Sequence, residues 1–304
     1  MGGGILVSIV IPTYNSARTL PRCLRSIEEQ TLKSYEAIIV DGLSRDRTKE
    51  IARQTVERNP AFRYIETLYK FQAPKRNVGV NHSKGEFVFF LDSDQYMAPK
   101  LLEKAIEYAE RGGIEALKIP EIPLPKASTL ARAENVIKYP TGYRTVHYRL
   151  FRREVFDKAG LLDPAIPYVE DLEFYLRMEL AKIKLGSMPL TKDAYLIHDE
   201  TITLRSVTLK RYYIGVGTAR TRRKFKEHAH LYTKYFSTGV QEGVKLASKY
   251  KLIMRRARKD PATLLTFMLL ILLRAVSMRI GYYVESALPA SPSTQSQALK
   301  RAGG

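Results

Sequence analysis

Two carboxylates that directly follow an apolar run are the first candidates for chemistry in this chain. Phe87 to Leu91 are apolar without interruption, and Asp92, Ser93 and Asp94 come directly after them. Two carboxylates so close together repel each other and lose hydration on burial, so the pair is costly unless a positive charge lies beside it. The pattern therefore predicts a positively charged partner for Asp92 and Asp94 in the folded protein.

Polar side chains also follow two other apolar runs of strand length. Asn15 comes after the run at 5–11, and Asp41 ends the run at 36–42 together with a glycine. Parallel strands bring their carboxyl ends to one edge of a sheet, and such sheets bind ligands there. Asp and Asn also form turns and cap helices without any ligand, which is the alternative for each residue taken alone. We favour a ligand site where Asp92 and Asp94 occur together.

The elements that must position these residues alternate between strand and helix, which predicts an α/β fold. Apolar and β-branched runs predict strands at 5–11, 36–42 and 86–94. Helical spacing and end signals predict helices at 17–30, 46–58, 74–85 and 99–113. Repeated β-α units with fully apolar strands imply a parallel sheet with helices on both faces.

The middle of the chain changes character. Three prolines predict an irregular segment at 119–130, and a strand followed by a short helix is predicted at 148–160. A further helix is predicted at 168–183, with Glu170 and Asp171 in its first turn. Carboxylates are stabilised at a helix N-terminus, so these two acids can be explained without a ligand.

Composition limits the classes of protein. Hydrophobic residues make up 45% of 304 residues, which excludes a disordered chain. The one cysteine, Cys23, allows no intramolecular disulfide or cysteine metal cluster and is expected in the core. Few Asn and Gln beside many Arg, Lys and Glu are typical of a thermophile. The net charge of +19 favours nucleic acid, an anionic membrane or phosphate-bearing substrates as partners.

The charge is concentrated near the C-terminus, directly before an apolar run. Residues 205–259 hold 16 Lys or Arg against two acids. The apolar run covers 262–273 and reaches 284 only by including Arg274 and Arg279. A spanning helix needs about 20 apolar residues, so the run is short unless the arginines face other helices or headgroups. We expect membrane insertion or interfacial attachment, with a buried helix of a soluble protein as the alternative.

These patterns predict three regions. An α/β domain is expected at 1–204, a basic amphipathic or transmembrane helical region at 205–285, and a disordered tail at 286–304. The basic flank predicts a cell-membrane protein whose α/β domain lies in the cytoplasm. No signal peptide is evident, because the run at 5–11 lacks a basic flank and stops at Pro12.

Four stretches in order resemble family 2 glycosyltransferases. They are VSIVIPTYNSARTLPRCLRSIEEQT, EAIIVDGLSRDRT, KRNVGVNHSKGEFVFFLDSDQYM and VED, within the part of the chain from Val7 to His198. The resemblance implies the GT-A fold, a nucleotide-sugar donor and a more distant likeness to cellulose synthase. It also implies a membrane-associated enzyme of glycan biosynthesis, such as N-glycosylation.

In this family a divalent metal ion neutralises the diphosphate that leaves the sugar. The resemblance implies Mg²⁺ or Mn²⁺ bound by Asp92 and Asp94, with His198 as an additional ligand. It further implies a set of nucleotide-sugar-binding residues, which are Pro12, Thr13, Tyr14, Asn15, Asp41, Arg76, Asp92, Ser93 and Asp94. For Arg76, a solvated helix charge is the alternative.

The catalytic pair implied by the resemblance is Asp171 as the base and Glu170 as its neighbour. In inverting transfer, the base removes the proton of the acceptor hydroxyl as the oxygen attacks the anomeric carbon. Membrane-bound relatives carry a Q-x-x-R-W motif where this chain has TARTRRKF, which lacks the glutamine and the tryptophan. Arg220, Arg222 and Arg223 in this stretch are expected to bind a pyrophosphate or an acceptor phosphate, unless they only form a basic membrane-facing helix.

The basic and apolar C-terminal region favours a lipid-linked acceptor. Polyprenyl or dolichyl phosphate, or an oligosaccharide carried on it, fits this region, with GDP-mannose as the preferred donor. One alternative is a glycosyltransferase that uses a UDP-sugar and a soluble glycan or protein. Another is a nucleic-acid-binding protein that uses the basic residues and tyrosines. That alternative leaves the N-terminal carboxylates unexplained, so we expect no nucleic-acid partner.

Overall fold

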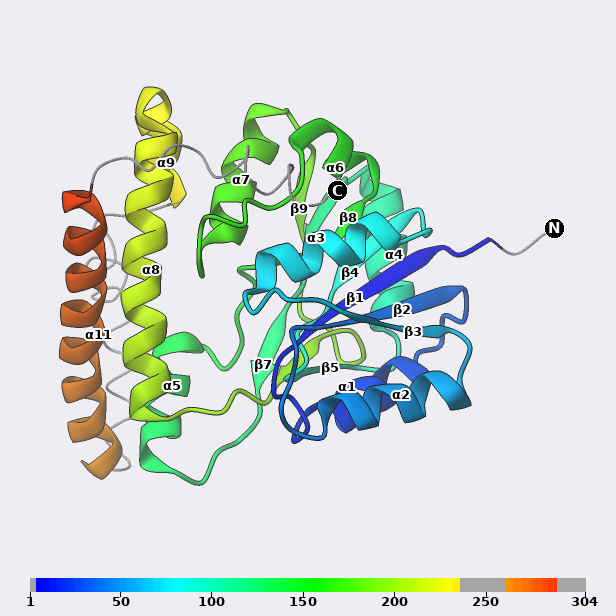
Figure 1. Ribbon diagram of the computed structural model, residues 1–304, viewed down its shortest axis with the longest axis horizontal. Coiled ribbons are helices and arrows are strands. Elements are labelled where there is room, and N and C mark those ends of the chain that lie inside the picture. Colours follow the sequence, from blue (N-terminus) through cyan, green and yellow to red (C-terminus); the bar gives the residue numbers. More distant parts are fainter. Residues whose placement is uncertain (1–3, 236–260, 289–304) are drawn as a thin grey trace.

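The computed structural model describes residues 4–235 and 261–288. Seven strands form the main sheet, and they are β1 (Val7–Thr13), β2 (Tyr35–Asp41), β3 (Phe62–Glu66), β4 (Phe87–Phe90), β6 (Ala116–Lys118), β8 (Tyr148–Arg152) and β9 (Leu185–Ser187). Their order across the sheet is β3-β2-β1-β4-β8-β6-β9 (Figure 1). The first four are parallel, while β8 runs antiparallel to both β4 and β6. The predicted parallel sheet is therefore confirmed for its N-terminal half and is mixed beyond it.

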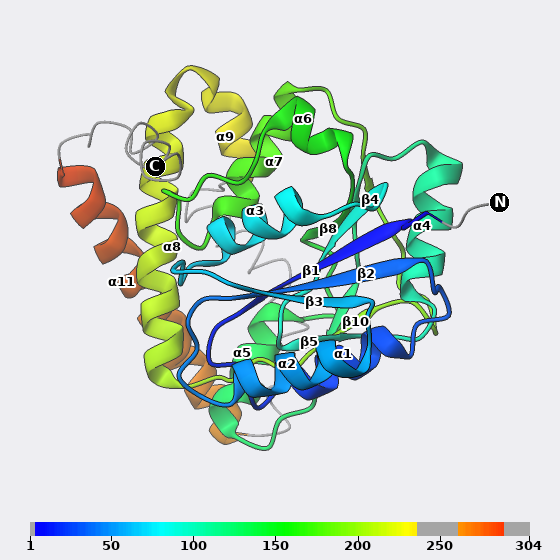
Figure 2. The same cartoon turned by 45° about the vertical axis from the view of Figure 1, so that its right-hand side comes forward.

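Helices cover both faces of this sheet (Figures 1 and 2). They are α1 (Leu20–Glu28), α2 (Thr48–Arg58), α3 (Gln72–His82), α4 (Leu101–Gly112), α6 (Glu154–Ala159) and α7 (Glu170–Leu180). Alternate residues of β1 serve the two faces: Ile9 and Ile11 pack with α1 and α4, whereas Val10 packs with α3 and α7. Cys23 is 1% exposed in the first of these clusters, so its predicted core position is confirmed.

A second, smaller sheet joins segments that are far apart in the sequence. It consists of β5 (Gln95–Met97), β10 (Leu196–His198) and β7 (Glu121–Pro123), with β10 in the centre. The prediction of an irregular segment at 119–130 is therefore wrong, since β7 lies inside it and α5 (Thr129–Lys138) begins there. Pro123 is tolerated because β7 is an edge strand, where a missing N–H breaks no ladder. This sheet brings His198 beside the residues that follow β4.

Two long helices stand beside the α/β domain. These are α8 (Leu204–Lys224), followed by η1 (Lys226–His228) and α9 (Ala229–Tyr235), and α11 (Pro261–Ala287). They lie side by side in Figure 1, and they cross in the view of Figure 2. A side chain on Gly215 would place its Cβ 2.0 Å from the carbonyl oxygen of Met278, and one on Gly281 would lie 2.0 Å from that of Tyr212. Glycine is required at both positions because the two backbones touch there.

The apolar segment belongs to α11. In the part of the chain described, one helical stretch, Leu264–Ala287, is long and apolar enough to cross a membrane, with a mean hydropathy of 1.9. It also packs on the α/β domain, where Phe267 and Leu270 join Ala133 of α5 and Val207 of α8. The helix continues two residues into the predicted tail. Residues 236–260 and 289–304, which hold the rest of the predicted basic region and tail, lie outside the described residues.

Candidate active site

The two carboxylates after β4 have different surroundings. Asp92 accepts hydrogen bonds from Arg76 of α3 at 2.7 Å and from Arg149 of β8 at 2.8 Å. Both arginine side chains are only 6% exposed. Burial alone would raise the pKa of Asp92, but the two guanidinium groups outweigh it and hold the pKa far below its usual range. The predicted positive partner of Asp92 is thus a pair of arginines, which contact one carboxylate oxygen each, and metal binding by Asp92 stays a prediction.

Asp94 faces the open side of the cleft. Its side chain is one third exposed, and Oδ2 lies 3.4 Å from Nε2 of His198 on β10. The other ring nitrogen of His198 pairs with the hydroxyl of Tyr139 at 2.9 Å, which fixes the ring with Nε2 toward Asp94. His198 thus lies beside Asp94, and their binding of a shared metal ion stays a prediction.

Asp94 and His198 fit a divalent metal that is shared with a substrate. No group of three or more His, Cys, Asp or Glu side chains forms a metal cluster within residues 4–235 and 261–288. Mg²⁺ is commonly held by one or two protein ligands and completes its shell with substrate phosphates and water. A carboxylate and an oriented imidazole at the cleft surface match that arrangement, so the donor set fits a metal brought together with a diphosphate.

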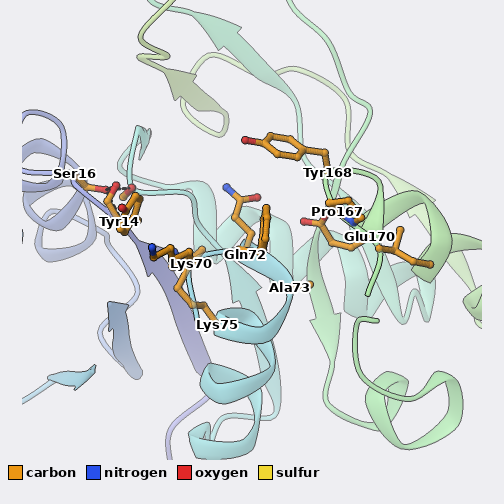
Figure 3. A pocket seen from close by; sticks show the side chains of 13 residues that line it. Tyr14, Ser16, Lys70, Gln72, Ala73, Lys75, Pro167, Tyr168 and Glu170 are labelled. Carbon is orange, nitrogen blue, oxygen red and sulfur yellow. Dashed lines mark hydrogen bonds between the residues drawn. The ribbon is translucent and has the colours of Figure 1, made fainter. Parts of the chain in front are cut away.

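A cavity of about 270 Å³ opens next to this point (Figure 3). Tyr14 and Lys75 form one side of it, and Tyr168 and Glu170 form the other. Nζ of Lys75 donates a hydrogen bond to the carbonyl of Thr13 at 2.8 Å. Burial lowers the pKa of Lys75 to about 8, so the amine is charged at neutral pH. An ammonium on the wall of a cavity suits an anionic ligand.

The predicted donor residues divide into those that line this cavity and those that do not. Pro12, Tyr14 and Ser93 line it. Asp41 is fully buried, and its carboxylate accepts hydrogen bonds from Thr13 Oγ1 at 2.8 Å and from the Ser44 backbone N–H at 2.9 Å. Asp41 and Thr13 are both buried and lie outside the lining of this cavity, so their contact with a nucleotide sugar stays a prediction.

Asn15 connects the loop after β1 to the loop after β2. It adopts a left-handed conformation with φ of 49°, and its side-chain oxygen accepts the backbone N–H of Arg45 at 2.8 Å. The residue itself is exposed and does not line the cavity of about 270 Å³. Its side chain thus joins two loops, and its contact with the nucleotide sugar stays a prediction.

A larger cavity of about 420 Å³ adjoins the first, since Gln72, Tyr168 and Glu170 line both. It contains most of the predicted catalytic and metal-binding side chains. The ionisable residues that line it are Arg76, Asp92, Asp94, Lys138, Arg144, His147, Tyr148, Arg149, Tyr168, Glu170, Asp171, Tyr175, His198, Glu200, Lys210, Arg211 and Arg274. The acids predicted from two separate stretches of the sequence, and His198 from a third, thus meet in one cleft.

The predicted catalytic pair lies at the N-terminus of α7. Oδ2 of Asp171 is 2.7 Å from Nδ1 of His147, and Oδ1 accepts the backbone N–H of Leu172 at 2.8 Å. Burial alone would raise the pKa of Asp171, but the contact with His147 lowers it. Burial and the neighbouring Asp171 raise the pKa of Glu170 to about 7. One acid of the pair is therefore ionised at neutral pH, while the other is poised near its midpoint.

The three arginines predicted to bind a phosphate lie outside both cavities. Arg220 and Arg223 form ion pairs with Glu285 of α11, at 3.0 and 3.6 Å. Arg222 donates to the hydroxyl of Tyr282 at 2.6 Å. The structure does not bring these three residues to either cavity, because this end of α8 turns them toward α11. The basic residues of α8 that do line the cleft are Lys210 and Arg211.

Sequence reasoning missed several residues of the cleft. Lys75, His147, Lys210 and Arg211 line the two cavities without having been singled out. Arg149 could have been recognised from the sequence, because it is a charged residue between apolar residues of a strand. A buried charge requires a partner of opposite sign, and Asp92 was already in need of one.

Comparisons with known proteins identify the family of the chain. Residues 8–160 match the sequence profile of "Glycosyl transferase family 2". An uncharacterized glycosyltransferase, EpsJ of Bacillus subtilis, is 26% identical over 225 residues, which cover 67% of this chain and 64% of EpsJ. Glycosyltransferase AglE of Haloferax volcanii is 34% identical over 36% of this chain and 37% of its own length. The chain thus spans less than two thirds of the length of these relatives.

Two solved structures share the fold. A mannosyltransferase, PcManGT from Pyrobaculum calidifontis in complex with GDP-Man and Mn²⁺, has a TM-score of 0.58 at 18% identity and covers 92% of this chain and 85% of its own. S. aureus TarS 1-349 in complex with UDP has a TM-score of 0.54 at 18% identity and covers 96% of this chain and 92% of its own. At this level of identity they establish the fold alone.

Proposed function

Because the chain belongs to glycosyltransferase family 2, we propose that it transfers a sugar from a nucleotide diphosphate to a lipid-linked acceptor with inversion at the anomeric carbon. The observation that carries this proposal is the convergence of Asp94 and His198 with Glu170 and Asp171 on one cavity, which adjoins a second cavity through Glu170. A donor in the smaller cavity would present its sugar to the larger one, where the acceptor enters.

On the donor side, different side chains contact different parts of the nucleotide. Tyr14, which is 39% exposed, offers its ring to the base, and the charged amine of Lys75 offers a contact to the diphosphate. Asp94 and His198 would hold Mn²⁺ or Mg²⁺, which when bound stabilises negative charge on the leaving diphosphate. Arg76 and Arg149 hold Asp92 and thereby fix the loop that carries Asp94.

The donor we favour is GDP-mannose. The mannosyltransferase with a similar fold was solved with GDP-Man and Mn²⁺, which supports this preference. TarS was solved with UDP and with UDP-GlcNAc, so a UDP-sugar is the alternative donor. The ring of Tyr14 suits either base, and the amine of Lys75 suits the diphosphate of either donor.

The lipid-linked acceptor is supported by the outer face of α11. Side chains on this face are 45–67% exposed, and they are Leu265, Met268, Leu269, Leu272, Val276, Ile280, Tyr283 and Val284. The inner face packs on α8 and α5, where Arg274 pairs with Glu134. We propose that the outer face contacts a bilayer on the cytoplasmic side and that the cleft thereby opens near the membrane surface. Recovery of the full chain in the soluble fraction without detergent would contradict this part of the proposal.

The donor and metal are tested together. Purified protein is incubated with GDP-mannose, UDP-glucose and UDP-GlcNAc, each with Mn²⁺ or Mg²⁺, with and without polyprenyl phosphate, and release of nucleotide diphosphate is followed. We expect metal-dependent turnover of one donor, preferably GDP-mannose, and its loss in Asp94→Ala. Undiminished turnover in that variant would refute the assignment of Asp94, and absence of turnover with all donors would refute the proposed function.

A further inference from the structure

A histidine outside the motifs of the sequence occupies the centre of the acceptor side. His147 directly precedes β8, and its Nδ1 lies 2.7 Å from Oδ2 of Asp171. The ring is 30% exposed and lines the larger cavity together with Asp94 and Glu170. Among the residues described, Nε2 has no hydrogen-bond partner. The imidazole is thus held by one nitrogen and leaves the other available in the cleft.

The carboxylate of Asp171 is less available than this nitrogen. Its Oδ2 is taken by His147, and its Oδ1 accepts the backbone N–H of Leu172 at 2.8 Å. In a neutral imidazole that donates through Nδ1, the lone pair lies on Nε2. Between Asp171 and His147, the atom better placed to accept a proton is therefore on the histidine.

The electrostatics agree with this geometry. Burial lowers the pKa of His147 from its ordinary value, with Asp171 opposing this effect and Arg144 and Arg149 adding to it. The imidazole is therefore neutral at pH 7 and can accept a proton. The pKa of Asp171 starts lower and is lowered further. Both groups can therefore accept a proton at neutral pH, and the geometry favours the imidazole, because Nε2 has no partner among the described residues.

We propose that His147 Nε2 takes the proton of the acceptor, that Asp171 holds the ring through Nδ1–H, and that the acceptor reacts through a hydroxyl group. The inference rests on the proposed glycosyl transfer and names the chemical class of its acceptor. A phosphate oxygen is already ionised near neutral pH and needs no base, whereas a sugar hydroxyl must lose its proton during attack.

The step balances without a further reactant. The acceptor oxygen forms a bond to the anomeric carbon while the bond from that carbon to the diphosphate oxygen breaks. The leaving electron pair stays on the diphosphate. The acceptor proton moves to Nε2 of His147, and the resulting imidazolium is stabilised by the carboxylate of Asp171 until the proton passes to water.

The test compares His147→Asn and His147→Gly with the wild type. Asn keeps an N–H donor for Asp171 but has no basic nitrogen, while Gly leaves space for added imidazole. Polyprenyl-diphosphate-linked N-acetylglucosamine is the hydroxyl acceptor and polyprenyl phosphate the phosphate acceptor. Where the wild type transfers to neither, donor hydrolysis is compared, since water also loses a proton. His82→Asn, at the exposed end of α3, is the matched control.

We expect kcat for the hydroxyl acceptor to fall by about 10²–10⁴-fold in His147→Asn. The Kd for the nucleotide diphosphate should stay unchanged, imidazole should restore activity to His147→Gly, and His82→Asn should match the wild type. A residue that only orients Asp171 would be rescued by Asn and not by imidazole.

Three outcomes would overturn the inference while leaving the proposed function intact. They are wild-type kcat in His147→Asn, failure of imidazole to restore a His147→Gly variant that still binds nucleotide, and transfer by the wild type to polyprenyl phosphate alone. A wild type that turns over no nucleotide sugar would instead refute the proposed function, on which the inference rests.

Discussion

The two carboxylates after β4 offer a sharp test, because each supports a different property of the protein. We consider Asp92→Asn and Asp94→Asn, which remove the same charge two residues apart. Asp92 is held by two arginines that are 6% exposed, so its replacement leaves buried charges without their partner. Breaking a buried ion pair typically costs about 3–5 kcal/mol. Asp94 is one third exposed and has a single histidine as partner, so its loss should cost about 1 kcal/mol or less.

Urea unfolding of the purified variants at pH 7, followed by circular dichroism, measures this difference. Asp92→Asn should lower the midpoint strongly without changing the slope of the free energy against urea. Since 1 kcal/mol shifts the melting temperature by about 2–4 °C in domains of this order of size, Asp92→Asn should melt about 6–20 °C below the wild type. Asp94→Asn should melt close to the wild type and should instead lose turnover that depends on Mn²⁺ or Mg²⁺.

Equal free energies of unfolding for the two variants would refute this reasoning. So would an Asp92→Asn protein that is as stable as the wild type but no longer responds to the metal. In that case Asp92 would be a metal ligand in the working enzyme, and Arg76 and Arg149 would have other partners once the donor is bound.

Three further perturbations have definite expected results. In Lys75→Met, the affinity for GDP or UDP should fall. The affinity of the wild type should itself decrease as the pH rises past 8, because the Lys75 amine has a pKa of about 8 and loses its proton. Calorimetry on either side of pH 8 should show that the variant lacks this decrease. Asp171→Asn should reduce kcat by about 10²–10⁴-fold with unchanged nucleotide affinity, and a retained kcat would exclude a role of this carboxylate in proton removal. Gly281→Leu forces a side chain against the carbonyl of Tyr212, so thermal unfolding should reveal a loss of about 1–3 kcal/mol, whereas an unchanged melting temperature would contradict the close contact of α8 and α11.

The parts of the fold that were predicted correctly are those encoded by local patterns. The runs that form β1, β2 and β4 are short and apolar, and the neighbouring helices have a clear three-and-four spacing. β7 was not predicted, because the prolines in and beside it argue against a strand. Its pairing partner, β10, also lies about 75 residues further on, a separation that no local sequence window can span. The α8–α11 contact is equally non-local, since it depends on two glycines, Gly215 and Gly281, that meet only in the folded chain.

The prediction identified the residues of the site better than it identified which of them contact each other. The resemblance indicated Asp94, His198, Glu170 and Asp171, which the structure gathers around one cavity. It indicated Arg76 but not as the partner of Asp92, and it did not indicate Arg149, which lies 57 residues away on β8 in a chain with 50 Lys and Arg. The position of a buried charge is set by tertiary packing, and only the folded structure identifies its partner.

The two arginines around Asp92 connect the halves of the cleft. Arg76 contacts Asp92 on the metal side and lies 3.5 Å from Glu170 on the base side. Arg149 binds Asp92 and stands two residues after His147 on the same chain segment, so the ion pair that anchors β8 also positions the imidazole relative to Asp94. In the proposed reaction, Asp92 would therefore set the distance between a diphosphate held at Asp94 and the imidazole of His147. We propose that the two acids of the motif divide these roles, one holding the cleft together and the other facing the ligand.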